Sequence, residues 1–455
     1  MSGEHLAEIG ETLDARRGES AGLVLREATV LDPVAGIEGV HDVVIRDGRV
    51  AKLAPPGSAA EDGAEVVEAA GMHAFPAFFD PHVHLRTPGH EHKEDVETGT
   101  RSAAAGGFCG VIAMANTEPP VSNAADVESL REAARDRASV PTGFLATVTR
   151  GMRGDDLTDM AELRDAGALG FSDDGLPIRS AGIMRRALQY QRLCGGTIAL
   201  HEEDPELSGA GVMHEGAISA ALGLAGIPSI SEATMIARDA AIAGYEGGRI
   251  HVQHLSAAES VEAVRAAKAA GIKVSCEATP HHLCTTDEQV RSLDPTRFKM
   301  NPPLRAEADR RALIEGLRDG TIDCIATDHA PHAVEEKEVP FESAAMGVTG
   351  LETAFAAIHT DLVLQGVIGL ELLVERLTGG AEPFGLRRPT LAPGGEANLA
   401  LCDLGAEWTV GEDGYESRSS NSWCAGRMLT GRVLMTVAAG QVAFRLRTFT
   451  LEVAS

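Results

Sequence analysis

Apolar runs of five to twelve residues alternate with Ala-rich stretches of helical spacing through the middle of the chain. Eight such runs occupy residues 74–85, 107–115, 142–148, 167–172, 197–201, 249–254, 272–278 and 322–328. Strands that are apolar on both faces and joined by helices predict a parallel sheet, and eight strand–helix units are the number that closes a barrel. The pattern therefore predicts a (β/α)8 TIM-type barrel over residues 75–384.

Both ends of the chain have a different pattern, of short β-branched runs separated by Asp-Pro, Asp-Gly and Gly-rich turns. Neither end holds enough strands to form a stable sheet alone. We therefore expect residues 21–74 and 385–455 to build one small composite β-sandwich domain. The first 20 residues are mostly polar, and we expect a disordered or weakly docked N-terminal tail there.

The formal net charge of -27 argues against nucleic acid and anionic membrane surfaces as partners, because both repel an acidic protein. The seven cysteines are scattered without a C-x-x-C pair, which suggests neither a disulfide framework nor a cysteine zinc site and is typical of a reduced compartment. No basic start followed by an apolar stretch opens the chain, and no apolar run has membrane length. We therefore expect a cytoplasmic protein whose partner is a small-molecule substrate.

Candidate chemistry gathers where the predicted strands end. His82, His84 and Arg86 alternate along the first strand, so their side chains should point the same way, into the barrel mouth where barrel enzymes build their sites. Other acids and imidazoles close four further strands: Asp173 and Asp174, His201, His254, and Asp328. Imidazole and carboxylate together suit zinc or a similar divalent ion, and a set this large can hold two of them.

The neighbouring polar residues have less specific interpretations. Asp173 and Asp174 point opposite ways, so only one can bridge two ions and the other should cap the following turn. His251 lies three residues before His254 and should face away from it, as a packing residue. His281 and His282 lie in segment 279–288, where a surface role and a role in a substrate-gating lid are equally open. The remaining histidines considered are read as structural or exposed: His73, His90, His92, His214, His329 and His359.

Several longer motifs resemble a known family. The runs DPHVHLRTPGHEHKED, AAAGGF, ANTEPPVSN, FSDDG, EATPHHL, MNPPLR and TDHAPHAVEEK are similar to those of the class I bacterial dihydroorotases of the amidohydrolase superfamily. The resemblance covers nearly the whole chain after the N-terminal tail. It implies a metal-dependent cyclic amide hydrolase that reversibly cyclises N-carbamoyl-L-aspartate to L-dihydroorotate in de novo pyrimidine biosynthesis.

The resemblance also implies a metal centre of two zinc ions per chain. His82, His84 and Asp328 would hold one ion, and His201 and His254 the other. Asp174 and a hydroxide would bridge both ions, and Asp328 would be the catalytic proton shuttle. Other superfamily members use a carboxylated lysine as the bridge, but segment 163–180 contains no lysine.

Substrate contacts implied by the same resemblance are Arg86, Asn116, Asn301, His332 and the backbone at Met346 and Gly347. The chain departs from the family pattern at Ala115, Glu202 and Met346, the last of which puts the shape of the substrate-contacting loop in question. The resemblance further implies a homodimer and leaves an association with aspartate transcarbamoylase open.

Two other functions fit the same residues. Another cyclic amidohydrolase, of hydantoinase or allantoinase type, would share the barrel and the metal ligands, although those relatives usually carry the lysine bridge and lack an arginine placed like Arg86. A noncatalytic dihydroorotase-like scaffold for aspartate transcarbamoylase would typically have lost metal ligands, whereas this chain keeps them. Assays with dihydroorotate, hydantoin and allantoin, together with metal analysis of the purified protein, separate these hypotheses.

Overall fold

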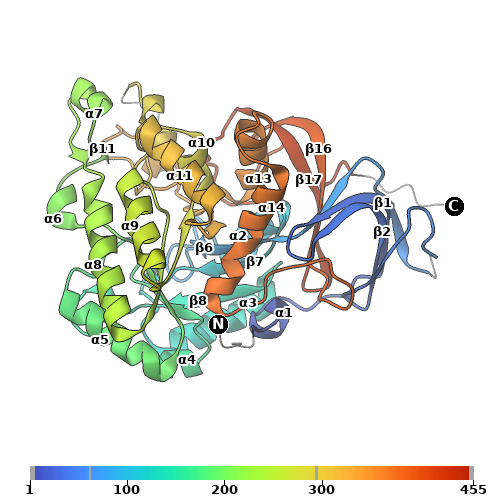
Figure 1. Cartoon of the computed structure of the whole chain (residues 1–455), viewed down its shortest axis with the longest axis horizontal. Helices are drawn as coiled ribbons and strands as arrows, with labels where there is room; N and C mark the ends of the chain where they lie inside the picture. Colours follow the sequence, from blue (N-terminus) through green and yellow to red (C-terminus); the bar gives the residue numbers. More distant parts are fainter. Residues whose placement is uncertain (1–5, 61–62, 293–295, 450–455) are drawn as a thin grey trace.

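The protein consists of a helix-wrapped barrel with a β-sheet built onto one side of it (Figure 1). The computed structural model describes residues 6–60, 63–292 and 296–449 of the 455-residue chain. Within these residues no helix is long and apolar enough to cross a membrane.

Eight parallel strands form the barrel, in the order in which they occur along the chain. They are β6 (Phe78–Val83), β7 (Phe108–Ala113), β8 (Thr142–Ala146), β9 (Gly170–Phe171), β10 (Thr197–Leu200), β13 (Arg249–Val252), β14 (Lys273–Ala278) and β15 (Cys324–Ile325). The barrel closes just after β15, where His329 forms a parallel bridge with Val83 and accepts a 2.9 Å hydrogen bond from the His84 amide. Each of the eight expected runs contains one of these strands, so the predicted barrel is confirmed.

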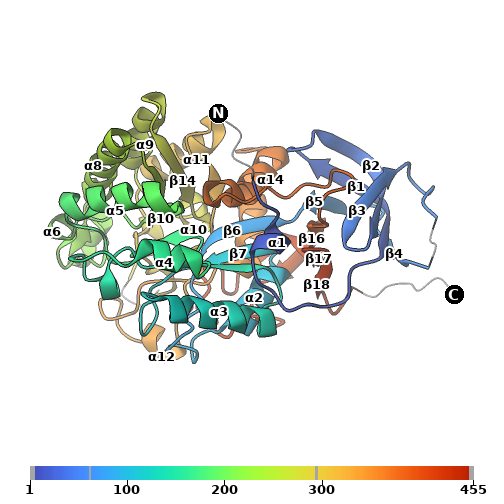
Figure 2. The same ribbon diagram turned by 90° about the horizontal axis from the view of Figure 1, so that it is seen from below.

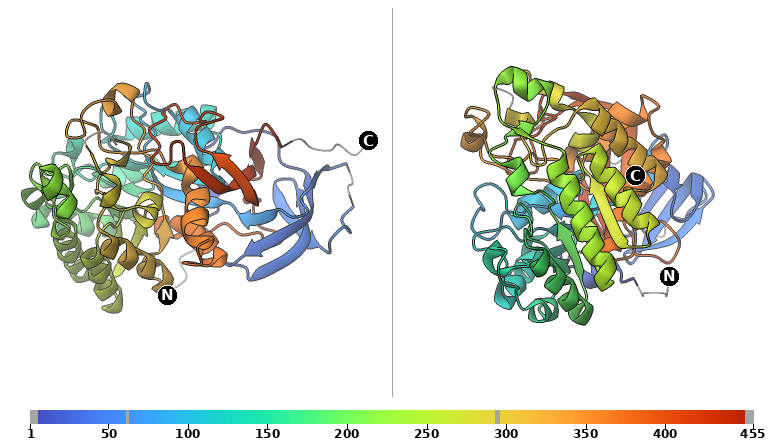
Figure 3. Two further views of the ribbon diagram at one scale, coloured as in Figure 1. Left: turned by 90° about the horizontal axis from the view of Figure 1, so that it is seen from above. Right: turned by 60° about the vertical axis from the view of Figure 1, so that its left-hand side comes forward.

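Helices cover the outside of the strands, as the views in Figures 2 and 3 show. Polar caps fix where several of them begin: Asp95, Asn123 and Ser180 each accept a hydrogen bond from a backbone amide in the first helical turn. The α-helices of six or more residues are α2 (Val96–Ala105), α3 (Ala124–Arg137), α4 (Met160–Asp165), α5 (Ala181–Cys194), α7 (Ala217–Leu222), α8 (Ile230–Glu246), α9 (Ala258–Ala269), α11 (Glu307–Asp319) and α14 (Leu370–Thr378).

The second sheet is composite, as the sequence predicts. Strand β5 (His73–Pro76) pairs in parallel with β1 (Leu23–Asp32) on one side and antiparallel with β16 (Leu399–Thr409) on the other. This pairing joins the N-terminal strands β2 (Ile37–Arg46), β3 (Arg49–Ala54) and β4 (Glu65–Glu68) to the C-terminal strands β17 (Met428–Ala438) and β18 (Gln441–Arg445). The blue and red ribbons in Figure 1 therefore lie together although they come from opposite ends of the chain.

Aromatic side chains fill the joint between the two parts. Phe78 of β6 lies edge-on to Phe108, with ring centroids 5.7 Å apart, and stacks on Phe355 at 5.5 Å. Phe355 belongs to α13 (Ala354–Ile358), which packs against β17. All three rings are buried, so the sheet and the barrel share one apolar core at this end.

The N-terminal segment differs from its prediction. For residues 6–20 the prediction of a disordered or weakly docked tail is wrong. Ile9 of the short helix α1 (Ile9–Thr12) and Leu13 are both buried against the barrel. Asp14 accepts hydrogen bonds from Arg131 at 2.6 Å and Arg135 at 2.8 Å. The four-residue spacing of the two apolar side chains is the signal of this docking, and the surrounding polar residues obscured it.

Candidate metal centre

Six side chains with metal-binding groups meet at the C-terminal end of the barrel strands. They belong to the ends of five strands: His82 and His84 at β6, Asp174 after β9, His201 after β10, His254 after β13, and Asp328 after β15. None of the six is more than 6% exposed. Because parallel strands end at one edge, the barrel brings together residues that are up to 246 positions apart in the sequence.

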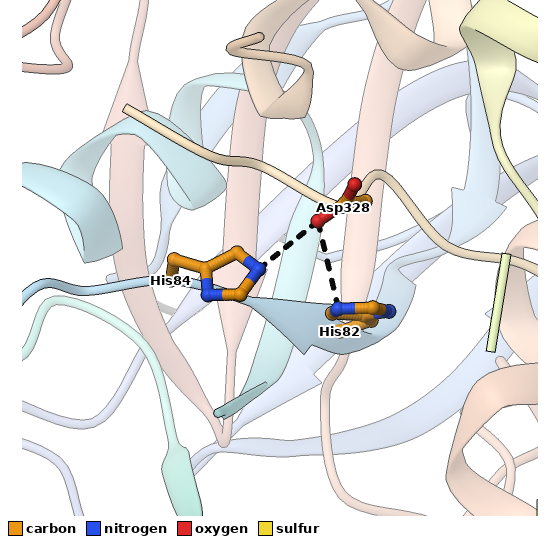
Figure 4. A group of neighbouring side chains, drawn as sticks. All are labelled: His82, His84 and Asp328. Atoms are coloured by element: carbon orange, nitrogen blue, oxygen red, sulfur yellow. Dashed lines mark hydrogen bonds and ion pairs between the residues drawn. The ribbon is translucent and has the colours of Figure 1, made fainter. Parts of the chain in front are cut away.

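His82, His84 and Asp328 form the first group (Figure 4). Asp328 Oδ1 lies 3.0 Å from His84 Nε2 and 3.5 Å from His82 Nε2. Figure 4 shows that the two imidazole rings, which come from one segment of the chain, both point towards the carboxylate of Asp328, which comes from another. The alternation along this strand therefore places His82 and His84 as the sequence predicts.

Asp174 lies among four imidazoles. Its Oδ1 is 3.6 Å from His82 Nε2, 3.7 Å from His254 Nε2 and 3.8 Å from His201 Nδ1, distances too long for hydrogen bonds. This oxygen is buried and accepts no hydrogen bond from any described residue. A buried carboxylate oxygen that faces several imidazole nitrogens across such gaps is what a divalent cation between them would require, and the donor set suits zinc. The residues present therefore fit a metal centre.

The charges around the site favour ionised carboxylates. Burial acts to raise the pKa of the Asp328 carboxyl, but the neighbouring His82 and the hydrogen-bonded His84 outweigh it and hold that pKa below its usual range. The pKa of Asp174 is lowered in the same way, against burial, by His254 and His82. Both side chains are thus held in the form that binds cations.

Asn116 and Asn301, predicted as substrate contacts, hydrogen-bond to candidate metal ligands. Asn116 Nδ2 donates to Asp174 Oδ2 at 3.0 Å, and its Oδ1 lies 2.9 Å from His84 Nδ1. Asn301 Nδ2 donates to Glu203 Oε2 at 2.6 Å and lies 3.3 Å from His201 Nε2. Its Oδ1 is buried without a partner among the described residues, so this amide keeps one acceptor for a further ligand.

Arg86 and His332 lie near the same mouth. Arg86 Nε donates to the Pro331 carbonyl at 3.1 Å, and Asp328 and Asp174 are the carboxylates that act most strongly on its guanidinium. Burial and the nearby Arg86 lower the pKa of His332 to about 3, which keeps this imidazole neutral. Its Nε2 donates to the Met346 carbonyl at 2.9 Å. His332 therefore lies within the electrostatic influence of the arginine and hydrogen-bonds to the loop that carries Met346.

Gly347 is held by a backbone hydrogen bond and lies close to two neighbouring side chains. Its amide donates to the Lys299 carbonyl at 3.0 Å, so this amide is already engaged. Its φ of +140° is a conformation that L side chains rarely adopt, and a Cβ would lie 2.8 Å from Ala330 Cβ and 2.9 Å from His332 Nε2. Glycine is therefore required here if His332 is to keep its place.

Two interpretations of neighbouring residues are wrong. Asp173 does not cap the following turn; its carboxylate accepts hydrogen bonds from the Val148 amide at 2.8 Å and the Thr149 amide at 3.1 Å, and so ties the end of β8 to the end of β9. A surface role for His281 and His282 is excluded, because both are buried in α10 (Pro280–Cys284).

Segment 279–288 therefore starts with a packed helix, and the lid hypothesis, which assumed an exposed loop, loses its basis. Helix α10 packs against α11 and α13. His282 bonds to Thr279 Oγ1 at 2.8 Å and to the Pro302 carbonyl at 3.0 Å. Both ring nitrogens of His281 are buried without a partner among the described residues, and burial lowers its pKa to about 4.

Glu277 is a site residue that the sequence reasoning missed. Its carboxylate is fully buried and contacts both His82 and His251. His251 is buried and hydrogen-bonded, in agreement with its predicted packing role. The available signal was a single carboxylate in the otherwise apolar end of the run IKVSCEA, where an unpaired charge would be costly.

Comparison with known proteins agrees with this geometry. A family model described as "Dihydro-orotase-like" matches residues 71–260. The chain is 48% identical over 426 residues to a dihydroorotase of Anaeromyxobacter sp. (strain K), covering 92% of this chain and 97% of the relative. It is 44% identical over 426 residues to a dihydroorotase of Pelotomaculum thermopropionicum, covering 93% of this chain and 99% of the relative.

Solved structures agree on the fold. An L-hydantoinase (dihydropyrimidinase) from Arthrobacter aurescens superposes with a TM-score of 0.82 at 27% identity, covering 93% of this chain and 96% of that one. A D-hydantoinase from Thermus sp. has a TM-score of 0.81 at 24% identity, with 94% and 97% covered. With relatives at this identity over almost its whole length and a candidate metal-binding set at the barrel mouth, the chain belongs to the dihydroorotase family of metal-dependent cyclic amide hydrolases.

Proposed function

We propose that this protein is a zinc-dependent dihydroorotase that interconverts N-carbamoyl-L-aspartate and L-dihydroorotate in de novo pyrimidine biosynthesis. The observation that carries the proposal is the convergence of six buried imidazoles and carboxylates at one barrel mouth, with Arg86 beside them. Such a site combines groups that activate water with a cation that binds an acidic substrate.

In this proposal His82, His84 and Asp328 would hold one zinc ion, and His201 and His254 would hold the other. Asp174 contributes to both, because its Oδ1 faces His82 as well as His201 and His254. Zinc held by these residues would supply a water of lowered pKa and would polarise the ring carbonyl. The carboxylates of Asp174 and Asp328 would only partly balance the charge of such ions, which favours an anionic substrate.

Asp328 moves the proton. Its carboxylate accepts a proton from the attacking water and then delivers it to the ring nitrogen that leaves when the amide bond breaks. The same steps in reverse close the ring in the biosynthetic direction.

Arg86 binds the carboxylate that the ring carries outside the reacting amide. Its fork matches a carboxylate in bidentate fashion, and Asn116, Asn301 and His332 orient the ring. The overall charge of -27 does not prevent this, because exposed charges are screened over about 8 Å in physiological salt. The Met346–Gly347 backbone shapes the pocket through His332, whose position depends on it.

The proposal extends to the protein's setting: a cytoplasmic homodimer, able to associate with aspartate transcarbamoylase. The homodimer and the association rest on the resemblance to class I dihydroorotases, whereas the cytoplasmic location rests on the scattered cysteines, which are typical of a reduced compartment. Light scattering tests the oligomeric state, since a homodimer has twice the 47.6 kDa of one chain. Co-elution with purified aspartate transcarbamoylase tests the association, with the separate proteins as controls.

The deciding experiment compares substrates. Metal-free protein reconstituted with zinc should hydrolyse dihydroorotate much faster than hydantoin or allantoin, because only dihydroorotate carries a carboxylate for Arg86. A preference for hydantoin would favour the function named for the structural neighbours. A protein that binds no metal and turns over none of the three would favour a noncatalytic scaffold.

A further inference from the structure

Glu277 lies behind the metal centre and touches both halves of it. Its Oε1 is 2.6 Å from His82 Nδ1, and the amide of His254 donates to the same oxygen at 3.3 Å. The side chain is fully buried at the end of β14. We infer that Glu277 is a positioning residue that holds one ligand of each proposed ion, His82 through its ring and His254 through its backbone. The inference deepens the two-ion centre of the proposed function and rests on it.

The contact with His82 determines which ring nitrogen faces the ions. An acceptor oxygen 2.6 Å from Nδ1 requires that Nδ1 carries the proton and donates it. Nε2 is then the nitrogen left for a metal, and it is the atom that lies 3.6 Å from Asp174 and 3.5 Å from Asp328. A carboxylate that fixes the tautomer and orientation of a ligating imidazole also raises its basicity.

The second oxygen of Glu277 is held in turn. His251 Nε2 donates to Oε2 at 2.9 Å, and His251 Nδ1 accepts from the Ser275 hydroxyl at 2.8 Å. Ser275 and Glu277 lie on β14 and His251 on the adjacent β13, so the chain of hydrogen bonds is anchored on two paired strands. His251 therefore holds the Glu277 carboxylate in place independently of the contact with His82.

The contact with His254 supports a strained backbone. His254 has a φ of +34°, in the left-handed region that non-glycine residues seldom occupy. The next amide, that of Leu255, donates to the Glu277 carbonyl at 2.9 Å. Side chain and main chain of Glu277 thus hold both amides at the turn that aims His254 at Asp174.

A different role for the same cluster is a cation site of its own. His251, Glu277 and Cys324 offer ligand atoms within 4.8 Å of one another. Both carboxylate oxygens, however, already accept hydrogen bonds from imidazoles, and His251 uses both ring nitrogens. These partners leave the cluster suited to orienting His82.

The test separates orientation from charge with two variants of similar volume. In Glu277→Gln the amide oxygen still accepts from His82 Nδ1, while in Glu277→Leu no acceptor remains. Zinc is titrated into each metal-free protein in the absence of substrate, against a competing chromophoric chelator. We expect Glu277→Leu to weaken both zinc-binding steps by about 10- to 100-fold, and Glu277→Gln to stay close to wild type.

Glu94→Leu is the matched control. Glu94 is as deeply buried and accepts from His329 at 3.2 Å, an imidazole outside the six ligands. Equal losses of zinc affinity in Glu94→Leu and Glu277→Leu would overturn the inference, as would wild-type affinity in Glu277→Leu. Loss of a whole metal equivalent with the other steps unchanged would make Glu277 a ligand instead. If Glu277→Leu does not fold, a 10-fold loss in Glu277→Gln refutes the orienting role. Failure of the proposed substrate leaves this substrate-free measurement unaffected.

Discussion

Replacing Arg86 by methionine tests how the site selects an acidic ring. The change keeps much of the apolar stem and removes the guanidinium. Burial lowers the pKa of this group, and the carboxylates of Asp328 and Asp174 act against that effect. Without it, the substrate carboxylate would lie near two negative side chains with no cation of the protein to bind it.

The size of the effect follows from the setting of the guanidinium. Truncating one partner of a buried, hydrogen-bonded charge pair costs roughly 2–5 kcal/mol. At about 1.4 kcal/mol per tenfold change, this cost corresponds to a loss of substrate affinity of roughly 30- to several-thousand-fold. Because burial already shields this side chain enough to lower its pKa, we expect a loss above 100-fold, about the middle of that range.

The assay follows dihydroorotate hydrolysis and metal content together. In Arg86→Met, KM for dihydroorotate should rise strongly while zinc content stays at the wild-type value, because Arg86 binds no metal. KM of Arg86→Lys should lie between the values of the wild type and Arg86→Met, because lysine keeps the positive charge but lacks the planar, bidentate guanidinium. Hydantoin, which has no carboxylate, serves as the internal control and should be hydrolysed no more slowly than by wild type. A wild-type KM for dihydroorotate in Arg86→Met would refute the reasoning.

Further predictions concern the proton path, the substrate loop and pH. Asp328→Ala should lower kcat by more than about 100-fold even after zinc is restored; turnover retained at full zinc occupancy would remove it as the proton shuttle. Gly347→Ala should raise KM, because its Cβ would lie 2.9 Å from His332 Nε2; an unchanged KM would show that His332 does not orient the substrate. Burial lowers the pKa of Lys337 to about 7, below the value of about 10.4 for an unfolded lysine. The folded state thus loses this proton first, so stability should rise between about pH 7 and pH 10. Urea unfolding across that range should show a smaller rise in Lys337→Met; an identical rise would exclude Lys337 as its source.

The barrel was predictable because its strands are buried on both faces, which leaves long apolar runs with strong contrast to the helices. The six candidate metal ligands were placed by the same regularity, since strand ends share one edge and alternation fixes the direction of His82 and His84. Their assignment to two ions and the roles of Arg86 and Asn301 came from the family resemblance.

What the sequence could not supply were contacts between distant segments. The docking of Ile9 and Leu13 depends on an apolar surface that only the folded barrel provides. Asp173 bonds to the amides of another strand end, which no local turn pattern reveals. Glu277 could be seen as an unusual acid in a strand, but its partners His82 and His251 come from two other strands. Long-range pairing of this kind has no signature in local periodicity.

The central claim is that six side chains hold two zinc ions at the barrel mouth. Anomalous diffraction at the zinc edge, on crystals of the reconstituted protein, tests it most directly. The account predicts two zinc peaks per chain, one next to His82, His84 and Asp328 and one next to His201 and His254, with Asp174 contacting both. Zinc bound elsewhere, or no zinc within reach of Asp174, would contradict it.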